Sequence, residues 1–126
     1  MDNKQVTALR EWLGAIMPTI TESLAGNLTM EMLTKMSKTE GVQGPFFINL
    51  KEYGAPITAI NFYFLIVEKT MMMATTADIE GAPENNKPEL KFNHFFTFDD
   101  FHTAVMEEDC QNQIIDTLME QIIKSE

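Results

Sequence analysis

Both histidines of the chain, its single cysteine and a cluster of carboxylates lie in the last third of the sequence. The stretch "KFNHFFTFDDFH" holds His94 and His102 with Asp99 and Asp100 between them, and Cys110 follows eight residues later. Imidazole nitrogens, thiolates and carboxylates bind metals and also act as bases and nucleophiles in catalysis. The spacing of these residues indicates whether they can bind a metal or act in catalysis.

The spacing does not favour a metal centre. Zinc sites use closely spaced pairs such as C-x-x-C or H-x-x-x-H, and neither occurs here. A single helix through residues 98–113 would place His102, Met106 and Cys110 on one side, at intervals of four residues. Without such a helix the three side chains have no common face. We therefore expect no metal and no cofactor.

The surroundings of these residues do not favour catalysis either. A nucleophilic cysteine needs a thiolate beside a base, whereas Cys110 lies in "MEEDCQNQ", where acids raise the pKa of a thiol. Asp99 and Asp100 are consecutive, so on a helix they point about 100° apart and are better suited to capping it. Phosphate-binding loops, nucleophile elbows and EF-hand loops are absent from the sequence. We expect that the protein is not an enzyme.

The N-terminal region has a helical period. Its apolar residues recur at steps of three and four: Val6, Leu9, Leu13, Ile16, Ile20 and Leu24. Pro18 predicts a kink or a restart inside this helix. Gly26-Asn27 predicts its end, followed by a new N-cap and a shorter helix. The short second stripe consists of Leu28, Met32, Leu33 and Met36.

The middle of the chain predicts strands. We expect a loop over residues 39–45 and a strand over 46–51, where apolar and polar residues alternate. Residues 57–77 predict two strands joined by a turn at Glu68-Lys69. The first of the two is rich in β-branched and aromatic residues, which is typical of a strand buried on both faces. One helix over the same residues is the alternative that the spacing leaves open.

The C-terminal third predicts a strand that leads into helices. A loop is expected over residues 80–89 and a strand over 90–98. The sequence Thr97-Phe98-Asp99-Asp100 matches a capping box, so a helix should begin near residue 98. The polar run over residues 107–113 should interrupt it before a final helix. That last helix has a stripe of Ile115, Leu118 or Met119, and Ile122.

These elements predict a single α+β domain over residues 1–126. We expect N-terminal helices, an antiparallel sheet of about three to four strands, and C-terminal helices packed on the sheet. In size, charge and order of elements the chain resembles the small acidic secretion chaperones, which are α+β dimers. The resemblance includes no shared motif and assigns no residue. It implies a possible homodimer, for which the apolar residues of the first or last helix are candidates.

The distribution of charge points to a protein partner. The net charge is −10, and residues 89–126 contain nine acids against two bases. Such a field repels nucleic acid and anionic lipid and attracts basic proteins. The apolar runs are too short for a membrane span, and one cysteine with a polar N-terminus predicts a cytoplasmic protein.

We therefore expect a protein-binding module, such as an adaptor, a chaperone, an immunity protein or a phage-type inhibitor, whose partner has a basic surface. The predicted acidic surface consists of Asp100, Glu107, Glu108, Asp109, Asp116 and Glu120. One alternative is a protein that binds a small apolar ligand in a pocket lined by aromatic rings. The rings predicted for that pocket are Phe46, Phe62, Phe64, Phe92 and Phe96. A weaker alternative is an acidic decoy for a nucleic-acid-binding protein.

Overall fold

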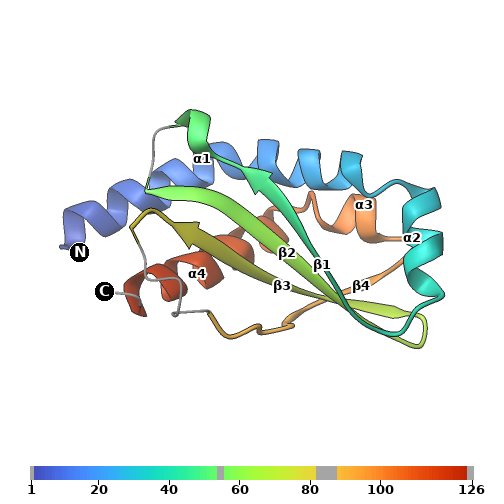
Figure 1. Cartoon of the computed structure of the whole chain (residues 1–126). Helices are drawn as coiled ribbons and strands as arrows, with labels where there is room; N and C mark the ends of the chain where they lie inside the picture. Colours follow the sequence, from blue (N-terminus) through green and yellow to red (C-terminus); the bar gives the residue numbers. More distant parts are fainter. Residues whose placement is uncertain (1, 54–55, 82–87, 125–126) are drawn as a thin grey trace.

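The computed structural model describes residues 2–53, 56–81 and 88–124 (Figure 1). The helices are α1 (Asn3–Asn27), α2 (Met30–Ser37), α3 (Phe101–Ala104) and α4 (Glu108–Lys124), with a 3-10 turn η1 (Lys51–Tyr53). The strands are β1 (Gly41–Asn49), β2 (Ile57–Val67), β3 (Thr70–Ile79) and β4 (His94–Thr97). The predicted α+β fold, with helices before and after an antiparallel sheet, is confirmed.

The first helix follows the predicted stripe. Asp2 and Gln5 form a capping box at its N-terminus. Of the kink or restart predicted at Pro18, the restart does not occur, because α1 continues through Pro18 to Asn27. Pro18 leaves the carbonyl of Gly14 without its helical donor, but both residues are exposed, so water can satisfy that carbonyl. The side chains that α1 buries are Leu9, Leu13, Met17, Ile20, Thr21 and Leu24.

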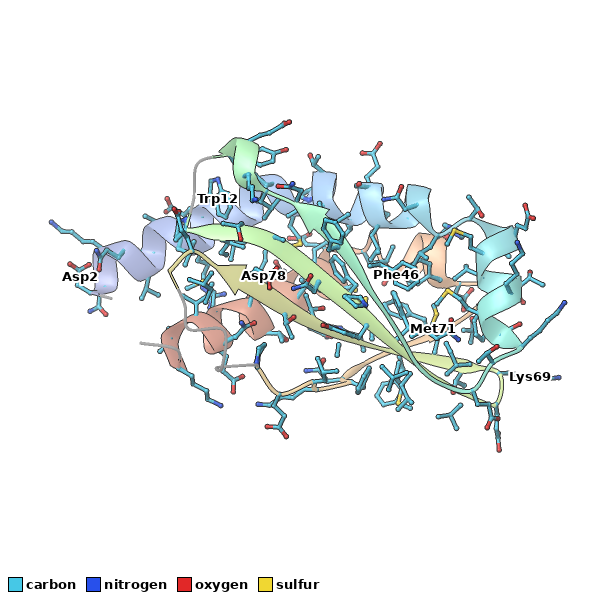
Figure 2. All side chains as sticks on the ribbon, viewed as in Figure 1. Asp2, Trp12, Phe46, Lys69, Met71 and Asp78 are labelled. Carbon is cyan, nitrogen blue, oxygen red and sulfur yellow. The ribbon has the colours of Figure 1, made fainter. Side chains whose placement is uncertain are left out.

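The predicted strand pair over residues 57–77 is confirmed, and the helical alternative is wrong. The sheet has the order β1-β2-β3-β4, with every neighbouring pair antiparallel. β2 and β3 form a long hairpin whose turn includes Glu68 at a φ of 56°. Lys69 extends from this turn at one end of the molecule (Figure 2).

The expected loop over residues 39–45 is wrong in its second half. β1 begins at Gly41 and contains an irregularity between Gln43 and Phe46. Gly44 lies there at a φ of +119°, and a Cβ on it would stand 2.8 Å from the carbonyl oxygen of Phe62. Only glycine allows the backbone of β1 to approach β2 so closely.

In the C-terminal third, the length of the strand and the residues at which the helices begin differ from the prediction. β4 covers four residues rather than the nine expected. The Thr97 hydroxyl accepts a hydrogen bond from the Asp100 amide at 3.2 Å, as the capping pattern requires. It closes a turn, however, and α3 starts only at Phe101. The polar run does not interrupt a helix, because α4 begins at Glu108. Residues 82–87 of the predicted loop lie outside the described residues.

The helices cover one face of the sheet. Arg10 contacts Asp116, and Thr21 contacts Gln111, so α1 and α4 run antiparallel to each other. In Figure 1 these two helices lie together on one side of the strands. Most strand side chains that point toward them are buried and form the core with the helical stripes, whereas Phe46 and Ile48 on β1 are only partly buried. Prominent among these strand residues are Ile60, Phe62, Phe64, Ile66, Met71 and Met73.

Two hydrogen bonds from the Gln121 side chain connect α4 to β3. The Gln121 side chain accepts a hydrogen bond from the Ala77 amide at 2.7 Å and donates one to the Ala77 carbonyl at 2.8 Å. β4 pairs with β3 only from Thr70 to Met73. Ala77 lies beyond that pairing, and Gln121 supplies the two hydrogen bonds that a neighbouring strand would otherwise provide.

Candidate functional site

Four of the six predicted acids lie within residues 100–109, between the N-cap of α3 and the first turn of α4. We call Asp100, Glu107, Glu108 and Asp109 the acidic end. All four are exposed, and none forms an ion pair with another described residue. Glu108 and Asp109 occupy the first turn of α4, where carboxylates interact favourably with the helix dipole. Part of this charge therefore stabilises the helix, and the whole of it remains accessible.

The other two predicted acids are already paired. Asp116 accepts a bond from the Arg10 guanidinium at 2.6 Å. Glu120 contacts Lys91 at 3.2 Å and Lys124 at 2.8 Å, and these partners lower the pKa of its carboxyl. The structure thus divides the predicted surface into an unpaired end and a neutralised stretch further along α4.

Hydrogen bonds fix the acidic end to the rest of the helical layer. The His102 Nε2 lies 2.6 Å from the carbonyl oxygen of Leu28, between α1 and α2. Gln111 donates to the hydroxyl of Thr21 on α1 at 3.0 Å. Met106, the residue before Glu107, is 37% exposed. Hydrogen bonds from His102 and Gln111 therefore connect the segment of the acidic end to α1 and to the residue after it, and Met106 adds an exposed thioether.

Cys110 does not have the properties of a nucleophile. Burial, together with the nearby Glu107 carboxylate, raises the pKa of its thiol to about 11. The predicted effect of neighbouring acids is confirmed, although burial contributes more. At neutral pH the thiol is protonated, so it packs as a small apolar group.

The two histidines have separate structural roles. His94 is 4% exposed, and its Nε2 has no hydrogen-bond partner among the described residues. Burial lowers the pKa of His94, and a side-chain hydrogen bond with Gln113 partly opposes this. His102, Met106 and Cys110 do not form a stripe on one helix. The chain is not helical over residues 105–107, so His102 lies on α3 and Cys110 on α4. Across the described ranges, no group of three His, Cys, Asp or Glu side chains could hold a metal ion.

The rings predicted to line an apolar pocket take part in core packing. Phe62 and Phe64 are fully buried, and Phe96 is nearly so. The ring centroids of Phe46 and Phe64 lie 5.7 Å apart, and Phe101 contacts both Phe64 and Phe96 at 5.8 and 5.3 Å. Phe92 is half-buried before β4. Binding of a ligand among these rings stays a prediction.

The structure also shows an apolar surface that the sequence did not assign. The sheet face opposite the helices, which we call the open face, carries one row of apolar side chains across all four strands. The cross-strand pairs place these residues side by side: Val42, Leu65, Met72 and Phe95. Val42 is 56% exposed and Phe95 is 72% exposed. The signal for this surface was present in the apolar character of both sides of residues 57–67.

Among the described residues, no helix has the length and apolar character that crossing a membrane requires. Comparisons of the chain with protein-family models, with curated proteins and with solved structures found no match. A functional proposal therefore depends on the residues of this chain alone.

Proposed function

We propose that this chain is a non-enzymatic protein-binding module whose acidic end binds a basic, amphipathic segment of a partner protein. One observation supports the proposal above the others. The acids at the start of α4 have no basic partners among the described residues, whereas Asp116 and Glu120, further along the same helix, are neutralised by neighbouring bases. An accessible cluster of unpaired charge attracts an oppositely charged surface.

The apolar surroundings favour an amphipathic partner over a merely basic one. Met106 is exposed directly before the acids. α2 begins two residues after Leu28, which contacts His102, and carries the exposed Met30 and Met32. Methionine side chains are flexible and polarizable, so they adapt to apolar side chains of varied shape. Acids and methionines together suit a segment with basic residues on one side and apolar residues on the other.

A pair of double substitutions with equal charge change tests this function. Glu107→Lys with Glu108→Lys changes the acidic end, and Asp116→Lys with Glu120→Lys makes the same change of net charge elsewhere on α4. Tagged wild-type and variant proteins would capture partners from a lysate of the native host, followed by mass spectrometry. We expect the acidic-end variant to lose a basic partner that the control retains, and added salt to weaken the capture.

The folding of both variants must be compared first. Lysine at Glu108 loses a favourable interaction with the N-terminus of α4, and the control loses its ion pairs. Circular dichroism and thermal melting would show whether each variant is folded, and Glu107→Gln with Glu108→Gln offers a milder change. Equal capture by wild type, acidic-end variant and control would refute the proposed role of the acidic end.

A further inference from the structure

On the open face of the sheet, opposite the helices, exposed apolar side chains lie on both outer strands, while the central strands are already buried at Ala59, Asn61, Ala74 and Thr76. Antiparallel sheets with one face toward water normally carry polar residues on that face. Here Phe47 is 62% exposed on β1, and Phe95 is 72% exposed on β4. Leu65 and Met72 lie half-buried between the two outer strands, in the row that joins Val42 to Phe95. This arrangement is typical of a surface that another layer of protein covers.

The open face is also almost free of charge. Asp78 is the only Asp, Glu, Lys or Arg in the four strands, although the chain carries nine bases and nineteen acids. Asn61 donates a hydrogen bond to its carboxylate at 3.0 Å, at the polar end of the face. The neighbouring turn adds one residue of each sign, Glu68 and Lys69. The acids are thus concentrated outside the sheet.

We propose that a second copy of this chain packs on the open face, sheet against sheet, to form a homodimer with both helical layers outside. A basic partner would be attracted to the acids of the helical layer and would gain no charge pairing on this face. Two copies with a net charge of −10 each repel one another, and the uncharged face is where they can approach with the least repulsion.

The distances in such a dimer keep the repulsion small. Packed sheets lie about 10 Å apart, and a helix with its side chains is about 10 Å across. The two helical layers would therefore be separated by about 30 Å, which is several times the Debye length of about 8 Å at physiological ionic strength. The two acidic ends would remain exposed, so the dimer would offer two copies of that surface.

The area of the face suits a modest dimer. Strands lie about 4.8 Å apart and rise about 3.3 Å per residue. Three long strands and the short β4 then give a face of at most about 500 Å² per copy, or about 1,000 Å² for both, and Ala59, Ala74 and Thr76 within it are already buried in the monomer. Specific interfaces begin near about 1,000 Å². The proposal consequently predicts an affinity in the micromolar range, and added salt should strengthen the association because it screens the charges.

The apolar stripes of the terminal helices do not compete for this role. The residues of α1 and α4 with the strongest helical period are buried in the core of the monomer. Ile123 is an exposed apolar residue of α4, at 49%, and stands apart from the buried stripe. It therefore provides a control position that lies outside the open face.

Sedimentation equilibrium over a wide range of protein concentration tests the proposal. We expect wild type to change from monomer to dimer, more readily at high salt. Phe95→Lys should raise the dissociation constant at least about 30-fold, because a substitution at a two-fold interface acts twice. Ile123→Lys makes the same change of charge and should leave the constant unchanged. Lysine lowers the net negative charge in both variants, so greater overall repulsion cannot explain a loss of dimer.

Three results would overturn the proposal. The first is a wild-type protein that stays monomeric at high micromolar concentration in high salt. The second is a dimer that survives both Phe95→Lys and Val42→Lys, because its interface would then lie elsewhere. The third is an equal loss of dimer in the Ile123→Lys control. Circular dichroism of each variant would establish that it is folded, which is expected because all three positions are substantially exposed.

Discussion

The two faces of the sheet come from the same strands and yet have different surroundings. On one face Phe62, Phe64 and Met73 are fully buried beneath α1 and α4. On the other face Phe47 and Phe95 are more than half exposed. Both sets are aromatic or aliphatic, so hydrophobicity alone does not distinguish them. The difference shows that the helices bury the large side chains of one face and leave aromatic rings of the other face exposed.

The largest difference between the faces should appear in stability. Phe64→Ala removes a fully buried ring and should lower the free energy of unfolding by about 3–5 kcal/mol. Phe95→Ala removes an exposed ring and should change it by less than about 0.5 kcal/mol in dilute protein. Urea denaturation at low concentration measures both. Equal destabilisation would mean that the two faces are buried alike.

The second largest change in the free energy of unfolding is expected from the hydrogen bonds between α4 and the sheet. Gln121→Ala leaves the Ala77 amide and carbonyl without their partner. Loss of such partners for partly buried groups should cost about 1–3 kcal/mol of unfolding free energy. Asn112→Ala, at an exposed position of the same helix, is the matched control and should have little effect. If both substitutions behave alike in urea, the two hydrogen bonds of Gln121 do not contribute to stability.

His94 and Phe95 are consecutive in β4 but lie on opposite faces of the sheet, and the burial of His94 should make stability depend on pH. Burial on the covered face lowers the pKa of His94 below its usual 6.5, whereas Phe95 points to the open face. The unfolded chain therefore binds a proton that the folded chain does not bind until lower pH. Stability is fully present above pH 6.5 and falls as the pH decreases from there toward the folded pKa.

Urea denaturation between neutral and mildly acidic pH measures this loss. His94→Gln should flatten the dependence. Carboxylates contribute their own dependence at lower pH, so the comparison is between variants at the same pH. A wild-type curve that coincides with that of His94→Gln would show that the ring is not kept neutral by burial.

The smallest effect is expected on the outside of the helical layer. The Arg10 and Asp116 side chains are 51% and 65% exposed, so solvent screens their ion pair. A double-mutant cycle with Arg10→Gln and Asp116→Asn should give a coupling of at most about 1 kcal/mol. The coupling should shrink further in high salt. A much larger value would mean that the helices are joined mainly by charge rather than by their buried stripes.

The period of the apolar residues was enough to predict most of the fold. Steps of three and four gave α1, and the β-branched composition favoured the strand pair over a helix. The errors arose where backbone geometry and local hydrogen bonds determine the residue at which an element begins. β1 starts earlier than predicted because Gly44 permits a close approach to β2. α3 starts later because the Thr97 hydroxyl closes a turn instead of capping the helix directly.

The candidate site could be predicted only in part. The acids were identified from composition, but their division into paired and unpaired groups depends on Arg10 and Lys91, which are distant in sequence. Their contacts exist only once α1 and the segment before β4 have packed beside α4. For the open face, the sequence predicted more burial than the monomer has. A strand buried on both faces was predicted for the first half of residues 57–77, and on the open face β2 is buried at Ala59 and Asn61 but only half-buried at Tyr63 and Leu65.

The central claim is that the two faces of one strand differ in what covers them, and three consecutive methionines test it directly. Met71 and Met73 are fully buried on the covered face, and Met72 is half-buried on the open face between Leu65 and Phe95. Methyl-labelled methionine allows each signal to be followed by NMR during dilution. We expect the Met72 methyl signal to shift with protein concentration while those of Met71 and Met73 do not. A Met72 signal that stays constant from low to high micromolar concentration would contradict it.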